Sequence, residues 1–453
     1  MPESKLWRVF YKGRWHTDTT GRTPAFAQLL TQNQLLKAAA LKKDLAQALA
    51  AQVESDGIGG DWEGTRKLTP ASVRDEANAA RRRAESLGKE KVITAMLQAA
   101  SHRGHLVIPS VSWDADPWQI GVQNGVLDLR TRLHHAGRTD DLITKSLNTE
   151  FNPGADCPEW RKFIARVMPN PELSDYLQTL CGYFLTGSRD DQAFYFFHGD
   201  GKNGKSILVG ALAALFGDYG AKARSALIEE SHNGTDPKAD IAQLPGIRFL
   251  HGEETRQGAR LREELVKSLT GGDSMKGEAK YAAPFDFVPI AKLVLMGNHK
   301  PRIYGTDGGI WRRVRLIPFT QVISEEEAIP PGVLMARFAG ESSGILNWLL
   351  EGLSRISAGV IPMPASVERA VAEYRSSEDD LGEFLGDCTQ DAAEGFKTHK
   401  GDLFTAYRKW AEGNGIRQTL TAKQLTRQLK ERPGWTMDPR RESWVGKSIR
   451  EGA

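Results

Sequence analysis

The chain has 453 residues, 40% hydrophobic and 26% charged, which is enough for about three globular domains. Its formal net charge is only +3, so the overall charge does not indicate a nucleic-acid partner. Such a partner must be inferred from local basic patches. The three cysteines are far apart, so neither a disulfide framework nor a zinc ribbon is predicted. No stretch approaches the ~20 apolar residues that cross a bilayer, and we expect a cytoplasmic protein with no membrane partner.

The first third of the chain is predicted to be mainly helical, with two hairpins. A Lys-Gly pair within residues 7–15 predicts a short hairpin, and an Asn-Gly pair predicts another within residues 120–129. Residues 34–53 and 70–87 have the spacing of amphipathic helices. A further helical stretch runs from 158 to 186, where the regularly spaced aromatic residues indicate a core.

A phosphate-binding loop is the most specific motif. Residues 192–197 form an apolar run typical of a buried parallel strand, and residues 207–216 continue as an apolar helix. Between them stands the pattern G-x-x-x-x-G-K-[ST], made of Gly199, Asp200, Gly201, Lys202, Asn203, Gly204, Lys205 and Ser206. In such a loop backbone N–H groups face phosphate oxygens, Lys205 reaches the β- and γ-phosphates, and the Ser206 hydroxyl ligates Mg²⁺. ATP and Mg²⁺ are therefore the expected ligands.

Two further strands are predicted to bring polar side chains to the same edge of a sheet. Residues 246–252 lead into Glu253 and Glu254, and paired acids allow one to hold Mg²⁺ and the other to orient water. Residues 291–296 lead into Asn298, which can hydrogen-bond the γ-phosphate or the attacking water.

Two adjacent arginines follow the predicted sensor asparagine. Arg312 and Arg313 lie in a segment, 307–319, that has the alternation of a strand. An arginine finger stabilises the charge on a transferring phosphoryl group, and in ring ATPases it acts on the nucleotide of the neighbouring subunit. One of these arginines in that role would require the chain to work as an oligomer.

This order of motifs resembles a superfamily 3 helicase. More closely, it resembles the phage and plasmid DNA primase–helicase family, which is akin to the poxvirus primase-helicase. The resemblance covers about residues 105–385 and rests on residues 124–129, 157–160, 182–187, 196–206, 265–273, 292–298, 301, 311–319 and 344–348. It implies an α/β fold with an AAA+-like P-loop ATPase core and a hexameric ring.

The resemblance also assigns roles within the site. Glu254 corresponds to the catalytic glutamate of the second motif, which leaves Glu253 on the metal side together with Ser206. Asn298 corresponds to the first sensor, and Arg312 or Arg313 to the finger.

A channel hairpin is implied for residues 274–282, where enzymes of this superfamily grip single-stranded DNA. Lys276 and Lys280 would contact backbone phosphates there, and Tyr281 would stack on a base. The alternative is an ordinary charged hairpin.

The chain departs from the family at its start. Family members that are primases carry an additional primase domain before the helicase region, and residues 1–104 are too short and too helical for it. We therefore expect a helicase of phage or plasmid replication in a bacterial host cell, with any primase supplied as a separate polypeptide.

The last segment is basic and resembles the winged-helix domain that often ends these proteins. Between residues 397 and 450 it holds thirteen Lys and Arg residues against five acids. This excess of positive charge fits binding to duplex or fork DNA as well as a solvated surface.

The predicted domains are 1–104 (hairpin and helices), 105–187 (collar-like), 188–330 (ATPase core), 331–375 (helical extension and linker) and 376–453 (winged-helix-like).

Three functions fit these motifs. The first is a hexameric helicase that translocates on single-stranded or forked DNA. The second is an ATPase switch or loader that remodels a replication complex without unwinding. The third is a nucleotide-gated origin-binding protein that acts through its tail.

Overall fold

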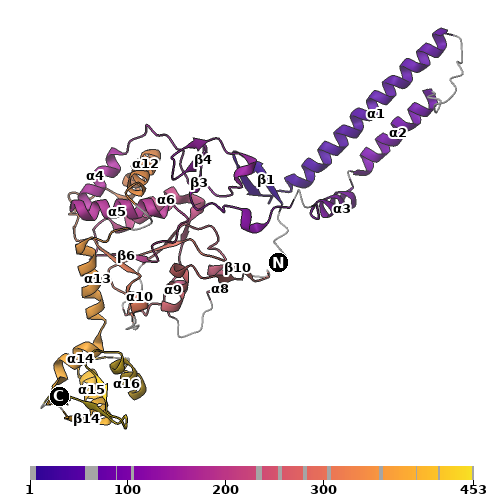
Figure 1. Cartoon of the computed structure of the whole chain (residues 1–453). Helices are drawn as coiled ribbons and strands as arrows, with labels where there is room; N and C mark the ends of the chain where they lie inside the picture. Colours follow the sequence, from indigo (N-terminus) through magenta and orange to yellow (C-terminus); the bar gives the residue numbers. More distant parts are fainter. Residues whose placement is uncertain are drawn as a thin grey trace. The chain divides into compact units, whose positions relative to one another are not determined.

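The computed structural model describes residues 7–56, 70–87, 89–103, 107–230, 237–253, 258–278, 283–303, 308–356, 361–393, 395–416 and 419–450. The chain divides into two compact units, Met1–Phe151 and Asn152–Ala453. The first unit is mainly helical, and the second contains a parallel sheet (Figure 1). The predicted mixed α/β class with a helical N-terminal region is confirmed.

The first unit is built on a long helical hairpin. Helices α1 and α2 pack along each other (Figure 1), and the side chain of Asp18 accepts the Thr23 N–H at the start of α1. The elements of this unit are β1 (Arg8–Tyr11), β2 (Arg14–Thr17), α1 (Arg22–Asp56), α2 (Pro70–Leu87), α3 (Glu90–Ala100), η2 (Ser110–Ser112), β3 (Gln119–Val122), β4 (Gly125–Asp128), β5 (His134–His135) and η3 (Thr139–Asp141).

Both predicted hairpins of this unit are confirmed. Lys12 and Gly13 take the left-handed conformation that a tight two-residue turn needs, with φ of 48° and 74°, and strands β1 and β2 pair on either side. The Asn-Gly turn joins β3 and β4 in antiparallel register, and β5 adds a third strand.

The second unit carries a five-stranded sheet in the order β12-β6-β11-β8-β7, and every neighbouring pair is parallel. The strands are β6 (Phe194–His198), β7 (Gly220–Lys222), β8 (Phe249–Gly252), β11 (Lys292–Gly297) and β12 (Val314–Pro318). Because all five run in one direction, their carboxyl ends meet at one edge, where ligands of such sheets bind.

Side chains cover both faces of this sheet, which explains the continuous apolar runs of its strands. On one face Phe194 and Phe196 join a buried cluster that also contains Val266. On the other face Tyr195 meets the ring of Phe184 edge-on, with 5.0 Å between centroids.

The helices around the sheet begin and end where the sequence breaks them. The stretch predicted as one helix from 158 to 186 is two, because Asn170 caps a new helix through the Leu173 N–H and Pro171 takes its first position. The helices and remaining hairpin of this region are α4 (Pro158–Val167), α5 (Pro171–Phe184), α6 (Lys205–Phe216), η4 (Gly217–Tyr219), α7 (Ser225–Ile228), α8 (Lys238–Ile241), α9 (Glu263–Gly271), β9 (Met275–Gly277), β10 (Phe285–Phe287), α10 (Gly308–Trp311), α11 (Pro331–Gly340), α12 (Ser342–Leu353) and α13 (Ala365–Ser377).

The C-terminal segment has a hydrophobic core of its own, which includes Phe384, Tyr407 and Trp444. Its three-stranded antiparallel sheet has the order β14-β16-β15, and β13 pairs with β17. Its elements are α14 (Asp380–Cys388), β13 (Thr389–Asp391), β14 (Lys397–His399), α15 (Lys400–Gly413), α16 (Ala422–Lys430), β15 (Thr436–Met437), β16 (Ser443–Val445) and β17 (Lys447–Ile449). Across the described ranges of the whole chain, no helix has the length and apolar character to span a membrane.

Candidate functional site

The loop between β6 and α6 has the backbone of an anion-binding site. Gly201, Lys202 and Gly204 take left-handed conformations, with φ of 97°, 44° and 82°. Lys202 is held in this strained state by its carbonyl, which accepts the Ile323 N–H at 2.7 Å. Successive N–H groups in such a turn point to one side, and the amino end of the 12-residue helix α6 adds its partial positive charge there.

Two glycines of the loop are required by close packing. A methyl group at Gly199 would overlap the Phe319 carbonyl, and one at Gly204 would overlap the side chain of Val167. The loop is therefore wedged between the end of β12 and helix α4.

Lys205 is the first residue of α6 and is only 5% exposed. Its ammonium group donates to the Gly199 carbonyl at 2.6 Å, to Asn203 Oδ1 at 3.0 Å and to Asn298 Oδ1 at 3.2 Å. These oxygens hold the cation at the mouth of the loop, where a phosphate oxygen is its natural acceptor.

Asn298 reaches Lys205 because β11 lies directly beside β6. The register pairs Gly297 with His198, so the residue after each strand lies at the same sheet edge. Asn298 is exposed to solvent, and its side-chain oxygen accepts the hydrogen bond from Lys205.

The acidic residue Glu253 follows β8 at the same edge, because Gly252 pairs with Leu295 of β11. Its carboxylate accepts from Lys222 Nζ of β7 at 2.5 Å and is 59% exposed. Glu254, predicted as the catalytic acid, lies outside the described residues.

The residues of this edge that the structure describes form no Mg²⁺ site from protein ligands alone. Within the described ranges, no three His, Cys, Asp or Glu side chains come close enough together to hold a metal ion. Ser206 is exposed at the start of α6, and Glu253 is exposed after β8. This set fits Mg²⁺, which usually takes one or two protein oxygens and completes its shell with water and substrate phosphates.

The two arginines differ in their surroundings, and both lie in the turn between α10 and β12 rather than on the strand. Arg313 is 8% exposed, and it donates to Thr270 Oγ1 at 3.1 Å and to the Gly309 carbonyl at 2.5 Å. Arg312 is exposed and forms no ion pair with a described residue. Arg313 is therefore held by hydrogen bonds within its own chain, whereas Arg312 is exposed.

Lys276 lies in a hairpin, as predicted. Strands β9 and β10 pair antiparallel, with Lys276 opposite Asp286, and the Lys276 side chain is exposed. Lys280 and Tyr281 fall between the two strands, outside the described residues.

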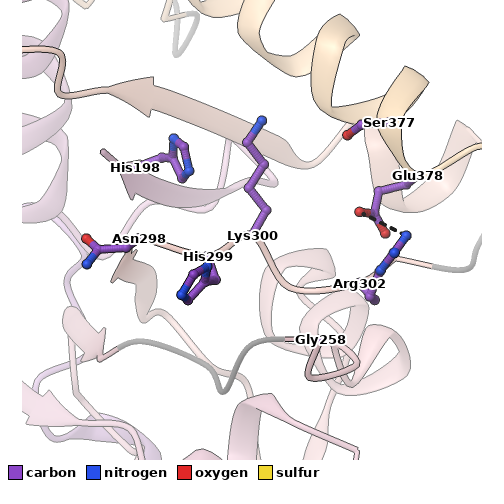
Figure 2. A pocket seen from close by; sticks show the side chains of 8 residues that line it. All are labelled: His198, Gly258, Asn298, His299, Lys300, Arg302, Ser377 and Glu378. Carbon is purple, nitrogen blue, oxygen red and sulfur yellow. Dashed lines mark ion pairs between the residues drawn. The ribbon is translucent and has the colours of Figure 1, made fainter. Parts of the chain in front are cut away.

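A pocket of about 370 Å³ beside the loop was not predicted. It is lined by His198, Gly258, Asn298, His299, Lys300, Arg302, Ser377 and Glu378 (Figure 2). Arg302 Nη1 lies 3.7 Å from the Glu378 carboxylate, and the Ile303 N–H donates to that carboxylate at 3.1 Å. Burial raises the pKa of Glu378 to about 7.

Two histidines at this edge have pKa values below the ordinary value of the side chain. Burial lowers the pKa of His198, and the charge of Lys300 lowers it further. Burial also lowers the pKa of His251, with the charge of Lys222 acting in the same direction. Nothing in their sequence spacing distinguished these histidines, although His198 immediately precedes the loop.

Two family models match separate parts of the chain. A model described as D5 N terminal like matches residues 1–169, and a model of a family of unknown function matches residues 197–313. A helicase-named protein of Acanthamoeba polyphaga mimivirus is 28% identical over 343 residues, covering 70% of this chain and 35% of that protein. A helicase-named protein of Invertebrate iridescent virus 3 is 27% identical, covering 48% of this chain and 24% of that protein.

A primase-named protein of African swine fever virus is 23% identical, covering 70% of this chain and 35% of that protein. Among solved structures, the apo C-terminal region of NrS-1 is similar over 62% of this chain and 64% of that chain, with 14% identity and a TM-score of 0.41.

These matches define a class of viral proteins named as helicases and primases. The matches support a primase-helicase-like family for the chain. It spans about a third of the length of the mimivirus and swine fever virus relatives. The names of these viruses do not refer to bacterial hosts. The bacterial host expected from the phage resemblance therefore stays a prediction.

Proposed function

We propose that this chain is the ATP-driven motor of a DNA helicase of viral replication, with an AAA+-like core of the superfamily 3 type. The observation that carries the proposal is the contact between Lys205 and Asn298 at the edge of the parallel sheet. A loop lysine and a polar sensor on the neighbouring strand are the two groups that must meet at a γ-phosphate. The helicase-named relatives support the same activity.

Hydrolysis in this proposal is an in-line attack of water on the γ-phosphorus. The bond from that phosphorus to the bridging oxygen breaks, which gives ADP and phosphate, and Glu254 accepts a proton of the water. Lys205 and the loop N–H groups bind the β- and γ-phosphates, and Asn298 orients the water. Mg²⁺, held by Ser206 and through water by Glu253, would neutralise charge on the phosphates.

The finger in this proposal is Arg312, contributed to the nucleotide of a neighbouring subunit. An exposed arginine without an ion-pair partner among the described residues is free to do this, whereas Arg313 is held inside its own subunit. This arrangement requires a ring, and a homo-hexamer is the form that we propose.

The DNA contact in this proposal is the hairpin of β9 and β10, with Lys276 on its first strand. Lys276 and Lys280 would bind phosphates of a single strand and Tyr281 would stack on a base. Movement of the hairpin with the nucleotide state would then pull the strand through the ring. A primase acting from a separate polypeptide completes the proposal.

ATP hydrolysis and unwinding of forked DNA test the proposal together. We expect single-stranded DNA to stimulate hydrolysis, and a Lys205→Ala protein to lose hydrolysis. A Lys276→Ala/Lys280→Ala protein should hydrolyse ATP without DNA stimulation and should not unwind. Its matched control is Lys37→Ala/Lys43→Ala, which removes two exposed lysines of α1.

The outcomes separate the helicase from its alternative. A wild-type chain that hydrolyses ATP but never unwinds a fork would fit a switch or loader instead. Normal unwinding by the Lys276→Ala/Lys280→Ala protein would refute the hairpin assignment, and hydrolysis by the Lys205→Ala protein would refute the ATPase site.

A further inference from the structure

Most of the pocket beside the phosphate-binding loop has no part in the proposed hydrolysis. Its volume is about 370 Å³, and it lies between the segment that follows β11, residues 298–302, and the carboxyl end of α13 (Figure 2). Asn298 belongs both to this pocket and to the loop, because its side-chain oxygen accepts from Lys205. The pocket therefore begins where a γ-phosphate is expected.

Three contacts fix the segment after β11 against the end of α13. The hydroxyl of Tyr374 donates to the Pro301 carbonyl, and Tyr374 is buried, so this hydrogen bond is shielded from water. The Ile303 N–H donates to the Glu378 carboxylate at 3.1 Å, and Arg302 lies 3.7 Å from the same carboxylate. The pocket is therefore a preformed space between two elements that are bound to each other.

Lys300 is the cation of this pocket that is not committed to an acid. Within the part of the chain that the structure describes, its ammonium group forms no ion pair, whereas Arg302 is paired with Glu378. The side chain of Lys300 is half-buried, and its ammonium group lies 5.2 Å from the centre of the Tyr374 ring. Figure 2 shows it between His198 and Glu378. A ring face attracts a cation but is a poor acceptor, so Lys300 keeps donors for an anion in the pocket.

The balance of charge in the pocket also favours an anion. Lys300 and Arg302 are cations, and Glu378 is the one acid among the described residues that line it. Burial raises the pKa of Glu378 to about 7, so near neutral pH this carboxyl group carries only part of a negative charge. The lining therefore has a net positive charge at neutral pH.

We propose that this pocket receives the inorganic phosphate that ATP hydrolysis releases, and that Lys300 binds it there. The proposal rests on the proposed ATPase site, since hydrolysis at the loop is what delivers a phosphate to Asn298. On the side of the loop the phosphate is blocked by the ADP from which it has separated. The pocket provides a path on the other side, and Lys300 is two residues beyond Asn298 along it. A hydrogen bond from an ammonium group to a phosphate dianion is charge-assisted and about twice as strong as a neutral one.

The functional consequence concerns the step that follows hydrolysis. Product release limits the turnover of many enzymes, and a cation that holds the product slows its departure. Lys300 thus sets how long phosphate stays beside Asn298 after the bond to ADP has broken. In this role Lys300 binds the product and takes no part in the attack of water.

Binding of inorganic phosphate to the full chain tests the pocket without hydrolysis. Calorimetric titration is made in the Lys205→Ala protein, in which the loop has lost its own cation. This protein should still bind phosphate, and adding Lys300→Met should weaken that binding by about tenfold or more, because a charged hydrogen bond is lost. Methionine keeps an apolar stem that can contact the Tyr374 ring. Lys300→Arg keeps the charge and should bind phosphate within about threefold of the Lys205→Ala protein.

Two further substitutions in the same background separate the pocket from overall charge. Glu378→Gln removes the acid of the lining and should tighten phosphate binding by about threefold or more at pH 8, where that acid is mostly charged. Lys91→Met removes the charge of an exposed lysine of α3 and should change phosphate binding by less than about twofold. Opposite effects at Lys300 and Glu378 are not expected from a fold that is merely damaged.

A single turnover of ATP with Mg²⁺ tests the role in product release. Phosphate release is followed with a fluorescent phosphate sensor, and bond cleavage is followed by acid quench. Lys300→Met in the otherwise wild-type chain should release phosphate about tenfold faster relative to bond cleavage, and it should lose more affinity for phosphate than for an ATP analogue.

Three results would overturn the proposal. The first is the absence of phosphate binding in the Lys205→Ala protein. The second is phosphate binding that Lys300→Met leaves unchanged or that Lys91→Met weakens equally. The third is an equal loss of affinity for phosphate and for the ATP analogue, which would place Lys300 on the γ-phosphate of ATP itself. If instead the wild-type chain hydrolysed no ATP while Lys300→Met still lost phosphate binding, the ATPase site would be refuted and the phosphate pocket upheld.

Discussion

The ammonium nitrogen of Lys205 lies 3.2 Å from the side-chain oxygen of Asn298, although 93 positions separate the two residues in the sequence. Parallel pairing of β6 with β11 brings them together, since Asn298 directly follows β11 and Lys205 ends the loop that follows β6. A lysine at the start of a helix and an amide on the next strand thus share one point at the sheet edge. That point is where a γ-phosphate is expected.

The first prediction separates binding from catalysis at this contact. Asn298→Ala should keep its affinity for an ATP analogue within a few-fold, because the loop and Lys205 remain. It should hydrolyse ATP about 10²-fold more slowly, because the lost amide would act on the attacking water or the developing charge. Measuring kcat and analogue binding in parallel with Lys205→Ala checks this. Equal loss of analogue binding in both proteins would contradict the sensor role.

The second prediction distinguishes the two arginines. Arg313→Ala should unfold at lower urea concentration, with a loss of about 1–3 kcal/mol, because its buried hydrogen bonds to Thr270 and Gly309 disappear. Arg312→Ala should fold within about 0.5 kcal/mol of wild type, since its side chain is exposed. It should nevertheless lose most DNA-stimulated hydrolysis, because a finger contributes about 10³-fold or more.

Mixing inactive proteins tests whether Arg312 acts between subunits. In a ring of Arg312→Ala and Lys205→Ala chains, some interfaces pair an intact loop with an intact finger, so part of the hydrolysis should return. Mixtures with Arg313→Ala in place of Arg312→Ala serve as the comparison. No recovery in any mixture, with rings still formed, would place the finger elsewhere.

The sequence was sufficient to predict the loop and its surroundings for a physical reason. A buried parallel strand, a glycine loop and an apolar helix are each specified locally, so β6, residues 199–204 and α6 could be recognised without tertiary contacts. Strand order depends on packing across the whole sheet, so local sequence does not determine that β11 lies next to β6. That neighbourhood could be inferred only from the order of the motifs.

Features that depend on distant packing could not be predicted. The arginines were expected on a strand, yet a short helix, α10, ends just before them and puts them in a turn. The segment expected as a helical extension and linker, residues 331–375, ends within helix α13, whose Tyr374 donates to the Pro301 carbonyl. No local pattern relates residues 298–302 to residues 377 and 378, so the pocket that these residues line was missed.

The third prediction concerns the contact of α5 with α12. A methyl group at Gly182 would overlap backbone atoms of Leu349 and Leu353, which cannot move without separating the helices. We therefore expect Gly182→Ala to lower the free energy of unfolding by about 2 kcal/mol or more. Gly386→Ala in α14 is the control, since a methyl group there would meet no neighbouring side chain or element within 4 Å, and it should raise that free energy by about 0.5–1 kcal/mol. Equal effects of the two substitutions would refute the close approach.

The fourth prediction is a pH dependence of stability that arises at Glu378. Its pKa is about 7 in the folded chain because burial opposes ionisation, whereas an unfolded glutamate titrates near its ordinary value of 4.5. The folded state therefore binds the proton more tightly. The contribution of Glu378 to the free energy of unfolding is complete below about pH 4.5 and is lost as the pH rises to about 7. Arg302, Lys300 and the Ile303 N–H favour the charged form, while Asp380 opposes it.

A Glu378→Gln protein cannot ionise at this position and still offers an oxygen to the Ile303 N–H. It should match wild type near pH 4.5 and exceed its free energy of unfolding above pH 7 by on the order of 1–3 kcal/mol. Urea unfolding at closely spaced pH values measures this difference. Glu373→Gln, which changes an exposed acid of helix α13, should follow the wild-type curve. Should Glu378→Gln also follow that curve, Glu378 would be charged in the folded chain, and the ion pair with Arg302 would outweigh its burial.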